Sequence, residues 1–406
     1  MNILALNCSS TRIKYKLYDA NDNFRLLSRG SAEKIGETHS LLIQQVTGHK
    51  EITISASFAE HCTAIRELLG ILIHDPSSPI NTFDQIDAVG HKILNGGEKL
   101  VSPAIIDDSI IETIRHCGKF APIHSRPNLI GLEEARKLIP LAEHIAVFDT
   151  ALHRTLPPKA YLYAMPIEYY EKYGVRKYGF GGICHGYVAN RAAEQMHQNL
   201  DEIKLITCHL GKSCSITAFQ NGKSIDTSMG LTPLEGLLME SRCGDIDPSV
   251  ILHLLEARHL YPTEIDDLLN RNCGLKGLCG KSDMRKVLEL VEKSDPHAVT
   301  ALAAFVYRVQ KYIGAYIAAL NGLDAIAFTG GIGENCPAVR SRIMENFCYV
   351  NAVIDPEKNE NNEAVFSDEN SKVRLMNIPE NDEMIIAKQT LETITKTKAV
   401  SAGNWG

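Results

Sequence analysis

The sequence predicts an α/β protein built of two domains. At 406 residues the chain is longer than one hydrophobic core usually serves, so two domains with a cleft between them are expected. In both halves, apolar runs of strand length alternate with segments of helical periodicity, which is typical of an α/β fold. A pattern of strand, polar turn and strand also occurs twice, and such a repeat indicates a duplicated domain.

The first copy of this repeat lies at the N-terminus. A strand is predicted over residues 3–6, a polar turn over 7–12 and an alternating strand over 13–18, with a third strand after residues 20–23. The second copy has the same order: strand 205–208, polar turn 211–214, strand 215–219, hairpin turn 220–222 and strand 223–226. Such turns are either ordinary solvated β-turns or, facing each other, a pair of backbone anion sites.

Helical periodicity fills much of the remaining chain. It is predicted over residues 58–74, 107–117, 128–138, 188–198, 248–256, 263–270, 284–291 and 298–320. The last segment is the most apolar, but it contains Arg308, Gln310 and Lys311, so a buried helix is predicted rather than a membrane span. The apolar run at 325–328 predicts one further strand.

Composition and charge narrow the class of protein. Hydrophobic residues make up 44% and charged residues 22%, and the formal net charge is -7, as in an ordinary globular protein. Without blocks of lysine and arginine, the chain lacks the positive surface that nucleic acid binding requires. The N-terminus enters a strand directly with no signal peptide, so a cytoplasmic protein without membrane insertion is predicted. The eleven cysteines include no Cys-x-x-C pair and are expected to be free thiols.

Three glycine-rich stretches predict an anion site. Residues 226–248 combine glycines, hydroxyls and carboxylates with Arg242, whose planar fork suits carboxylate or phosphoryl oxygens. Residues 209–215 and 329–335 each follow an apolar, strand-like run. Two alternatives stay open: Arg242 in a surface salt bridge, and a tight strand-to-helix turn at 329–335, which would explain the glycines but not the following Glu334 and Asn335.

Longer motifs then match a known family. They are Asn7 with Ser10 and Lys14, and residues 89–98, 120–124, 147–151, 178–180, 209–211, 226–248 and 330–335. In order and over nearly the whole chain they resemble acetate kinase, and the chain is identified as a member of the acetate and propionate kinase family. The resemblance implies a duplicated actin-like, ribonuclease H-like ATPase fold, in which two domains close around ATP, usually in a homodimer. It also implies an N-terminal domain of residues 1–150, with a C-terminal helix 384–406 packing back on it, and a nucleotide-binding domain of residues 151–383.

The reaction implied is the reversible transfer of the γ-phosphoryl group of ATP to acetate or another short-chain carboxylate, which gives an acyl phosphate and ADP. Such a transfer depends on in-line positioning, on Mg²⁺ or Mn²⁺ at the phosphates and on cations around the transferring group. By resemblance, Asn7 and Asp382 hold the metal. The family usually has glutamate at position 382, and the shorter side chain makes a water-bridged contact plausible. Asp149 is the implied active-site carboxylate, with an N-cap or turn aspartate as the alternative, and Arg242 neutralises the transferring group.

The nucleotide-binding residues are likewise implied by position. They are Lys14, His209, Gly211, Lys212, Ser213, Asp283, Met284, Arg285, Gly331, Ile332, Gly333, Glu334 and Asn335. Glycines fit this role, because a backbone lying flat against a nucleotide cannot carry a Cβ everywhere.

Several positions depart from the family pattern. Gly181 replaces the histidine that stabilises the transition state, a loss worth about 10²- to 10³-fold in rate, and Lys92 replaces an arginine fork with a point charge. Asn95 replaces a histidine. Further changes lie in the two phosphate turns, at Ser9, Arg12, Lys212 and Ser213. The new cations Arg12 and Lys212 are expected to compensate partly for Gly181.

Two alternatives follow from these departures. One is a catalytically impaired paralogue that binds nucleotide or acyl phosphate in a regulatory role. The other keeps the enzyme but changes the acceptor, because Lys92, Asn95 and Gly181 together would enlarge or repolarise the carboxylate pocket and admit propionate or a bulkier acid.

Overall fold

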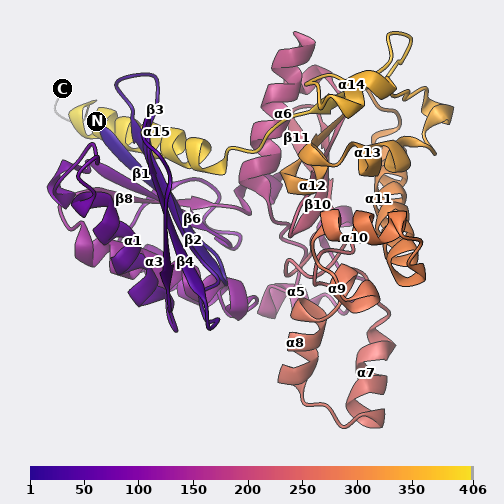
Figure 1. The fold of residues 1–406 in the computed structure, drawn as a ribbon, viewed down its shortest axis with the longest axis horizontal. Coiled ribbons are helices and arrows are strands. Elements are labelled where there is room, and N and C mark those ends of the chain that lie inside the picture. Colours follow the sequence, from indigo (N-terminus) through magenta and orange to yellow (C-terminus); the bar gives the residue numbers. More distant parts are fainter. Residues whose placement is uncertain (404–406) are drawn as a thin grey trace. The chain divides into compact units, whose positions relative to one another are not determined.

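The computed structural model describes residues 1–403 and divides the chain into two units (Figure 1). Unit 1 consists of residues 1–151 and the chain from residue 381 onward, and unit 2 of residues 152–380. The helix that returns to unit 1 begins at Asp382, two residues before the predicted start at 384. Residues 404–406 of that predicted helix lie outside the described residues.

Unit 1 is a mixed sheet with helices on both faces. Its strands are β1 (Asn2–Cys8), β2 (Arg12–Asp19), β3 (Arg25–Glu33), β4 (Ser40–Val46), β5 (Ile52–Ala56), β6 (Ala88–Ile93), β7 (Ala104–Ile105) and β8 (Glu143–Phe148). Its helices are α1 (His61–His74), α2 (Asp108–Cys117), α3 (Pro122–Leu138) and α15 (Asp382–Gly403). Across the sheet the order is β5-β4-β3-β2-β1-β6-β8-β7.

Unit 2 has a smaller sheet and more helices. Its strands are β9 (Leu205–Leu210), β10 (Cys214–Gln220), β11 (Lys223–Thr227), β12 (Ala325–Thr329) and β13 (Arg374–Asn377), in the order β11-β10-β9-β12-β13. Its helices are α4 (Pro158–Tyr161), α5 (Glu168–Tyr173), α6 (Gly182–Met196), α7 (Pro248–Ala257), α8 (Pro262–Arg271), α9 (Gly274–Cys279), α10 (Met284–Glu292), α11 (Pro296–Leu320), α12 (Gly330–Asn335), α13 (Pro337–Met344) and α14 (Pro356–Glu360).

Both sheets contain the same five-strand plan. In unit 1, β1 pairs antiparallel with β2 and parallel with β6, while β2 pairs with β3 and β6 with β8. In unit 2, β9 pairs antiparallel with β10 and parallel with β12, while β10 pairs with β11 and β12 with β13. The repeat of strand, turn and strand predicted from the sequence is therefore the start of a duplicated sheet.

In each copy, the chain leaves the fifth strand and supplies a helix to the sheet of the other unit. After β8 the chain enters unit 2, where α6 packs on β9 and β12. After β13 it returns to unit 1, where α15 packs on β1, β6 and β8. Unit 1 is therefore completed by a distant part of the sequence, whereas unit 2 is formed by one continuous segment.

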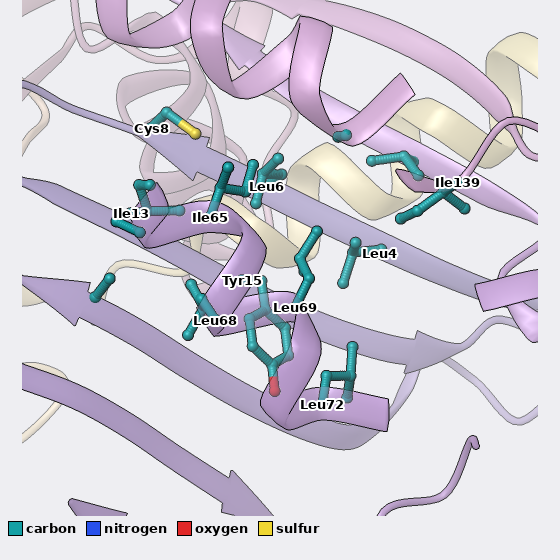
Figure 2. Packing of buried hydrophobic residues seen from close by; sticks show 14 of the residues in the cluster. Leu4, Leu6, Cys8, Ile13, Tyr15, Ile65, Leu68, Leu69, Leu72 and Ile139 are labelled. Atoms are coloured by element: carbon teal, nitrogen blue, oxygen red, sulfur yellow. The ribbon is translucent and has the colours of Figure 1, made fainter. Parts of the chain in front are cut away.

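The core of unit 1 lies between the sheet and helices α1 and α3. Leu4 and Leu6 of β1 and Tyr15 of β2 point toward Ile65 and Leu69 of α1 (Figure 2). Because successive residues of a strand face opposite sides of the sheet, the residues between them face α15. The strand β1 is buried on both faces, so helices cover both faces of the sheet.

Local sequence explains how many of the helices begin. Helices α7, α11 and α14 each start with an Asp-Pro pair, at Asp247, Asp295 and Asp355, whose side chains accept hydrogen bonds from backbone N–H groups of the first turn. Proline fits the first helical position because its missing N–H would have no partner there. Among the described residues, no helix is both long and apolar enough to cross a membrane.

Several predicted boundaries differ from the structure. Helix α6 begins at Gly182 rather than at residue 188, and helix α1 begins at His61 rather than at residue 58. Helix α3 begins at Pro122 rather than at residue 128, and Pro127 lies inside it. The glycine-rich residues 330–335, which were expected to lie flat against a nucleotide, form the short helix α12 after β12, which is the strand-to-helix turn left open above.

Candidate functional site

In unit 1, three predicted site residues gather at one edge of the sheet. Strands β1, β6 and β8 run parallel, with Leu6 opposite His91 and Ile93 opposite Phe148. Their carboxyl ends therefore lie side by side, and they carry Asn7, Lys92 and Asp149. In open α/β sheets this edge is where ligands usually bind.

Lys92 connects two of the predicted carboxylates. Its Nζ atom lies 2.7 Å from Asp382 Oδ2 and 3.3 Å from Asp149 Oδ1. Asp149 is only 3% exposed, and its backbone N–H donates to the carbonyl of Ile93, so it directly continues the sheet edge. It is not the N-cap of a helix but lies in the turn that follows β8, which is the second form of the alternative stated above. The structure thus brings Lys92, Asp149 and Asp382 together.

Asp382 keeps one oxygen without a partner. Its Oδ2 accepts a hydrogen bond from Lys92, while Oδ1 is buried and has no hydrogen-bond partner among the described residues. A buried carboxylate oxygen without a donor is energetically unfavourable unless a ligand or cation completes it. This oxygen is therefore a candidate metal ligand.

The start of α15, which carries Asp382, is held by Lys16. Its Nζ donates to Asn381 Oδ1 at 3.0 Å and lies 3.2 Å from Glu383 Oε2. Asn7 and Lys14 lie directly opposite each other on β1 and β2. Nothing in the sequence pattern indicated Lys16, because its partners are more than 360 positions away.

Asn95 has an unused donor. Its Oδ1 accepts a hydrogen bond from the N–H of Gly97 at 2.7 Å, which fixes the orientation of the amide. Its Nδ2 is buried and has no partner in the described part of the chain. Nearby in sequence, Gly96 donates its N–H to the Thr150 hydroxyl, next to Asp149. This amide can therefore donate to an anionic or carbonyl oxygen.

In unit 2, the ends of β9 and β12 bring two predicted nucleotide segments together. The two strands are parallel, with His209 opposite Thr329. A Cβ on Gly211 would lie 3.5 Å from the backbone nitrogen of Gly331, so the two glycine turns touch. Gly330 has a φ of 80°, and a side chain there would collide with the Leu210 carbonyl. Only glycine fits this junction.

Arg242 lies against the same turn. Its Nη1 donates to Ser213 Oγ at 3.1 Å and approaches the Pro233 carbonyl at 3.4 Å. Burial lowers the pKa of the guanidinium, yet arginine stays protonated in proteins. A half-buried cation beside the Ser213 hydroxyl is suited to bind an anion. Arg242 is therefore half-buried and directed toward the Ser213 turn, which is not the setting of an exposed surface arginine.

Gly181 precedes helix α6 with a φ of 75°. A Cβ there would lie 3.2 Å from Ser215 Oγ and 3.3 Å from the His185 ring. His185 itself is enclosed, because its two ring nitrogens meet the hydroxyls of Thr207 and Ser215 at 2.6 and 2.7 Å. A histidine at position 181 would therefore be strained at this φ and would require the neighbouring side chains to shift slightly.

The remaining predicted nucleotide residues differ in exposure. Asp283 caps α10 and forms an ion pair with Arg285 at 2.7 Å, while Met284 is buried. Lys212 is exposed at the tip of its turn. Among residues 331–335, Gly331 and Asn335 are exposed, Ile332 and Gly333 are buried, and Glu334 accepts hydrogen bonds from the N–H groups of Gly330 and Glu380. Burial raises the pKa of Cys336, at the end of α12, while the charges of Arg340 and Arg285 lower it.

Comparison with known proteins identifies the group to which this chain belongs. A family model described as the acetokinase family matches residues 2–388. The acetate kinase of Carboxydothermus hydrogenoformans is 44% identical over 396 residues, which cover 97% of this chain and 99% of the relative. Among solved structures, a propionate kinase from Francisella tularensis superposes with a TM-score of 0.90 at 36% identity, covering 96% of this chain and 99% of that chain. The acetate kinase of Porphyromonas gingivalis gives a TM-score of 0.88 at 36% identity, covering 97% of this chain and 99% of that chain.

Fold and sequence together define a phosphotransferase that acts on a carboxyl group and has the duplicated actin-like fold. The chain belongs to the acetokinase family. The family resemblance inferred from the motifs is thereby confirmed, and ATP is the co-substrate that this family uses.

Proposed function

We propose that this chain is an ATP- and Mg²⁺-dependent kinase that transfers the γ-phosphoryl group reversibly to acetate or a similar short-chain carboxylate. The observation that carries the proposal is the pairing of full-length similarity to acetate kinases with a half-buried Arg242 at the Ser213 turn. A working enzyme is favoured over a regulatory relative, because Asn7, Lys14, Asp149 and Arg242 are all present.

The proposed metal ligands are Asn7 and Asp382. Mg²⁺ prefers oxygen ligands and is usually bound by one or two protein groups together with phosphates and water. The Oδ1 atom of Asp382 supports this assignment. It is buried and accepts no hydrogen bond from the described residues, so a bound cation would supply the missing interaction. When bound, the metal neutralises charge on the phosphates of ATP.

The remaining roles concern positioning and charge. We assign Asp149 to orienting the acceptor carboxylic acid and Arg242 to neutralising the transferring phosphoryl group. Lys92 takes the place of a fork-shaped arginine and holds Asp149 by an ion pair. It therefore orders the carboxylate but offers the acceptor only a point charge.

The proposed nucleotide contacts lie along the two glycine turns of unit 2. His209, Gly211, Lys212 and Ser213 face the phosphates, and residues 331–335 with residues 283–285 lie toward the nucleoside. The exposed ammonium of Lys212 is available to an anion. Arg12 is less available, since it lies 3.5 Å from Glu33, so Lys212 carries most of the proposed compensation for Gly181.

Asn95 supports a preference for a particular acceptor. Its buried Nδ2 donor lacks a partner, and a carboxylate oxygen of the acceptor would supply one. An amide also occupies less space than the histidine it replaces. We therefore propose that propionate is accepted alongside acetate, and that Asn95→Ala lowers kcat/KM for both acids.

A hydroxamate assay for acyl phosphate tests the proposal. The protein is incubated with ATP, MgCl₂ and a panel of short carboxylic acids, and product should form with acetate and propionate. Arg242→Ala should reduce kcat by about 10²-fold or more, whereas Arg271→Ala, which removes an exposed arginine on α8, should leave the rate unchanged. Nucleotide binding without product from any acid would refute a working kinase.

We also propose a cytoplasmic homodimer, on the family resemblance alone. Sedimentation velocity of the purified chain measures its mass directly, and a single species at the mass of one chain would exclude the dimer.

A further inference from the structure

A cysteine, a histidine and a glutamate from three separate segments meet in unit 2. Cys184 Sγ lies 3.4 Å from His209 Nδ1, and the same nitrogen lies 3.7 Å from Glu380 Oε2. All three ligand atoms lie within 4.8 Å of one another. We propose that these side chains form a binding site for Zn²⁺, distinct from the Mg²⁺ ligands proposed above.

The separations match those that a zinc ion imposes. Zinc binds thiolate sulfur at about 2.3 Å and imidazole nitrogen at about 2.0 Å, so two such ligands of a tetrahedral ion lie about 3.5 Å apart. The observed distance between Cys184 Sγ and His209 Nδ1 is 3.4 Å. The carboxylate is only slightly farther away and lies on an exposed side chain that is able to move inward.

The donor set selects against magnesium. A thiolate, an imidazole and a carboxylate are ligands of zinc and of neighbouring transition metals, whereas Mg²⁺ takes oxygen ligands. Three protein ligands leave the fourth tetrahedral position to water, as in open zinc sites. On binding, the Cys184 Sγ–H bond breaks, the proton passes to solvent and the Zn–S bond forms.

The surroundings fix the ligands without closing the site. Cys184 lies in the first turn of α6, where the positive end of the helix dipole favours a thiolate. His209 ends β9, and the backbone of Glu380 is held by Glu334 Oε1 at 3.0 Å. The Glu380 side chain is 41% exposed, which gives an ion a route from solvent.

Metal binding would have a defined effect on His209. A neutral imidazole carries one ring proton, and a metal on Nδ1 leaves that proton on Nε2. The Nε2 atom faces the other way, 3.7 Å from where a Cβ of Gly211 would lie. Zinc would therefore hold His209 as a hydrogen-bond donor toward the glycine turn.

Cobalt provides a test that needs no enzymatic activity. The full chain is stripped of metal with a chelator and titrated with Co²⁺, whose bond to a thiolate gives a charge-transfer absorption band. We expect one Co²⁺ per chain with that band, and its loss when Zn²⁺ is added. Cys184→Ser, which keeps the side-chain size and a hydrogen-bonding group, should abolish the band.

Two further variants keep the test decisive. Cys348→Ser, at an exposed cysteine outside the cluster, should retain the band and so exclude a general thiol effect. Glu380→Gln changes only an exposed side chain and should weaken Co²⁺ binding with the fold intact by circular dichroism. Absence of the band in the unmodified protein, or an unchanged band in Cys184→Ser, would overturn the proposal.

Discussion

At the sheet edge of unit 1, the Lys92 ammonium forms ion pairs with two carboxylates, Asp149 and Asp382. The three side chains are 16%, 4% and 15% exposed, so the charges are largely removed from water. In that setting each charge depends on its partner, and deletion of the cation leaves two acids close together. The same ammonium also occupies Asp382 Oδ2, which limits how strongly a divalent cation binds that carboxylate.

Lys92→Met should lower the free energy of unfolding by about 3 kcal/mol, because it removes the cation that lies between two largely buried carboxylates. MgCl₂ should raise the melting temperature of this variant more than that of the unmodified protein, since the cation replaces the missing charge. Differential scanning calorimetry with and without MgCl₂ measures both effects. Lys92→Arg is the control and should resemble the unmodified protein. Equal shifts in all three proteins would contradict competition at Asp382.

Gly181 occupies a left-handed backbone conformation that other residues adopt at a cost of about 1–2 kcal/mol. Gly181→Ala should therefore destabilise the protein by roughly that amount in urea unfolding. The matched control is Gly186→Ala within α6, where a Cβ has ordinary contact with Leu152 at 3.5 Å and alanine favours the helix by about 0.5–1 kcal/mol. If both variants changed stability in the same direction, the backbone argument would fail.

At the scale of elements, α15 approaches β6 closely because residue 90 has no side chain. A Cβ on Gly90 would overlap Thr390 Oγ1 and lie 2.7 Å from Ile386 Cγ2. Thr390 and Ile386 are fully buried, so neither has space to withdraw. The position of Asp382 at the start of this helix thus depends on a glycine in the facing strand.

Gly90→Ala should push α15 away from the sheet and destabilise the protein by about 1–3 kcal/mol, the usual effect of overpacking a core. Mg²⁺ binding should weaken with it, because Asp382 moves with the helix. Calorimetric titration and thermal unfolding report the two effects. Gly314→Ala in α11, where a Cβ meets no atom within 4 Å, serves as the control and should leave both unchanged or slightly improved.

A pair of buried histidines joins β6 to β8. His91 Nε2 lies 2.9 Å from His144 Nδ1, and His144 Nε2 lies 3.0 Å from the Ile139 carbonyl. His144 therefore donates to the carbonyl and accepts from His91, and both rings are neutral. Burial lowers the pKa of each histidine below the ordinary value of 6.5, most strongly for His91.

Because the folded pKa of His91 lies below the unfolded value, the unfolded chain binds more protons once the pH falls below about 6.5. The free energy of unfolding should therefore be highest above that pH and should decrease below it, by up to about 1.4 kcal/mol per pH unit for each histidine. Urea unfolding between pH 5 and pH 8, in about half-unit steps, measures the slope. His91→Gln should flatten it, while substitution of the exposed His74 should not.

Most helices and the repeated sheet could be predicted because their signals are local. Asp-Pro pairs mark where α7 and α11 begin, and apolar alternation marks β2. Helix α3 starts six residues earlier than predicted, since Pro127 suggested a helix boundary although the helix continues through it. The short helix α12 was expected to be a flat glycine turn because glycine disfavours a helix, and this segment contains three glycines.

At the scale of the whole molecule, family motifs indicated which residues matter but not how they pair. The contact of Lys92 with Asp382 and that of His209 with Glu380 join segments with no local relation in sequence. A hydrogen-bond donor without a partner, such as Asn95 Nδ2, can be recognised only when all neighbouring atoms are known. The residue types of the site were therefore more predictable than the contacts between them.

The position of α15 in the sequence sets the order in which unit 1 is completed during synthesis. Lys92 and Asp382 are 290 positions apart, and the helix that carries Asp382 leaves the ribosome after every strand of both sheets. A nascent chain can complete the sheet of unit 2 before α15 has been synthesised to cover β1 and β6. The sheet of unit 1 therefore lacks one of its covering helices until α15 has been synthesised. A polypeptide truncated before that helix lacks Asp382, one of the two proposed metal ligands.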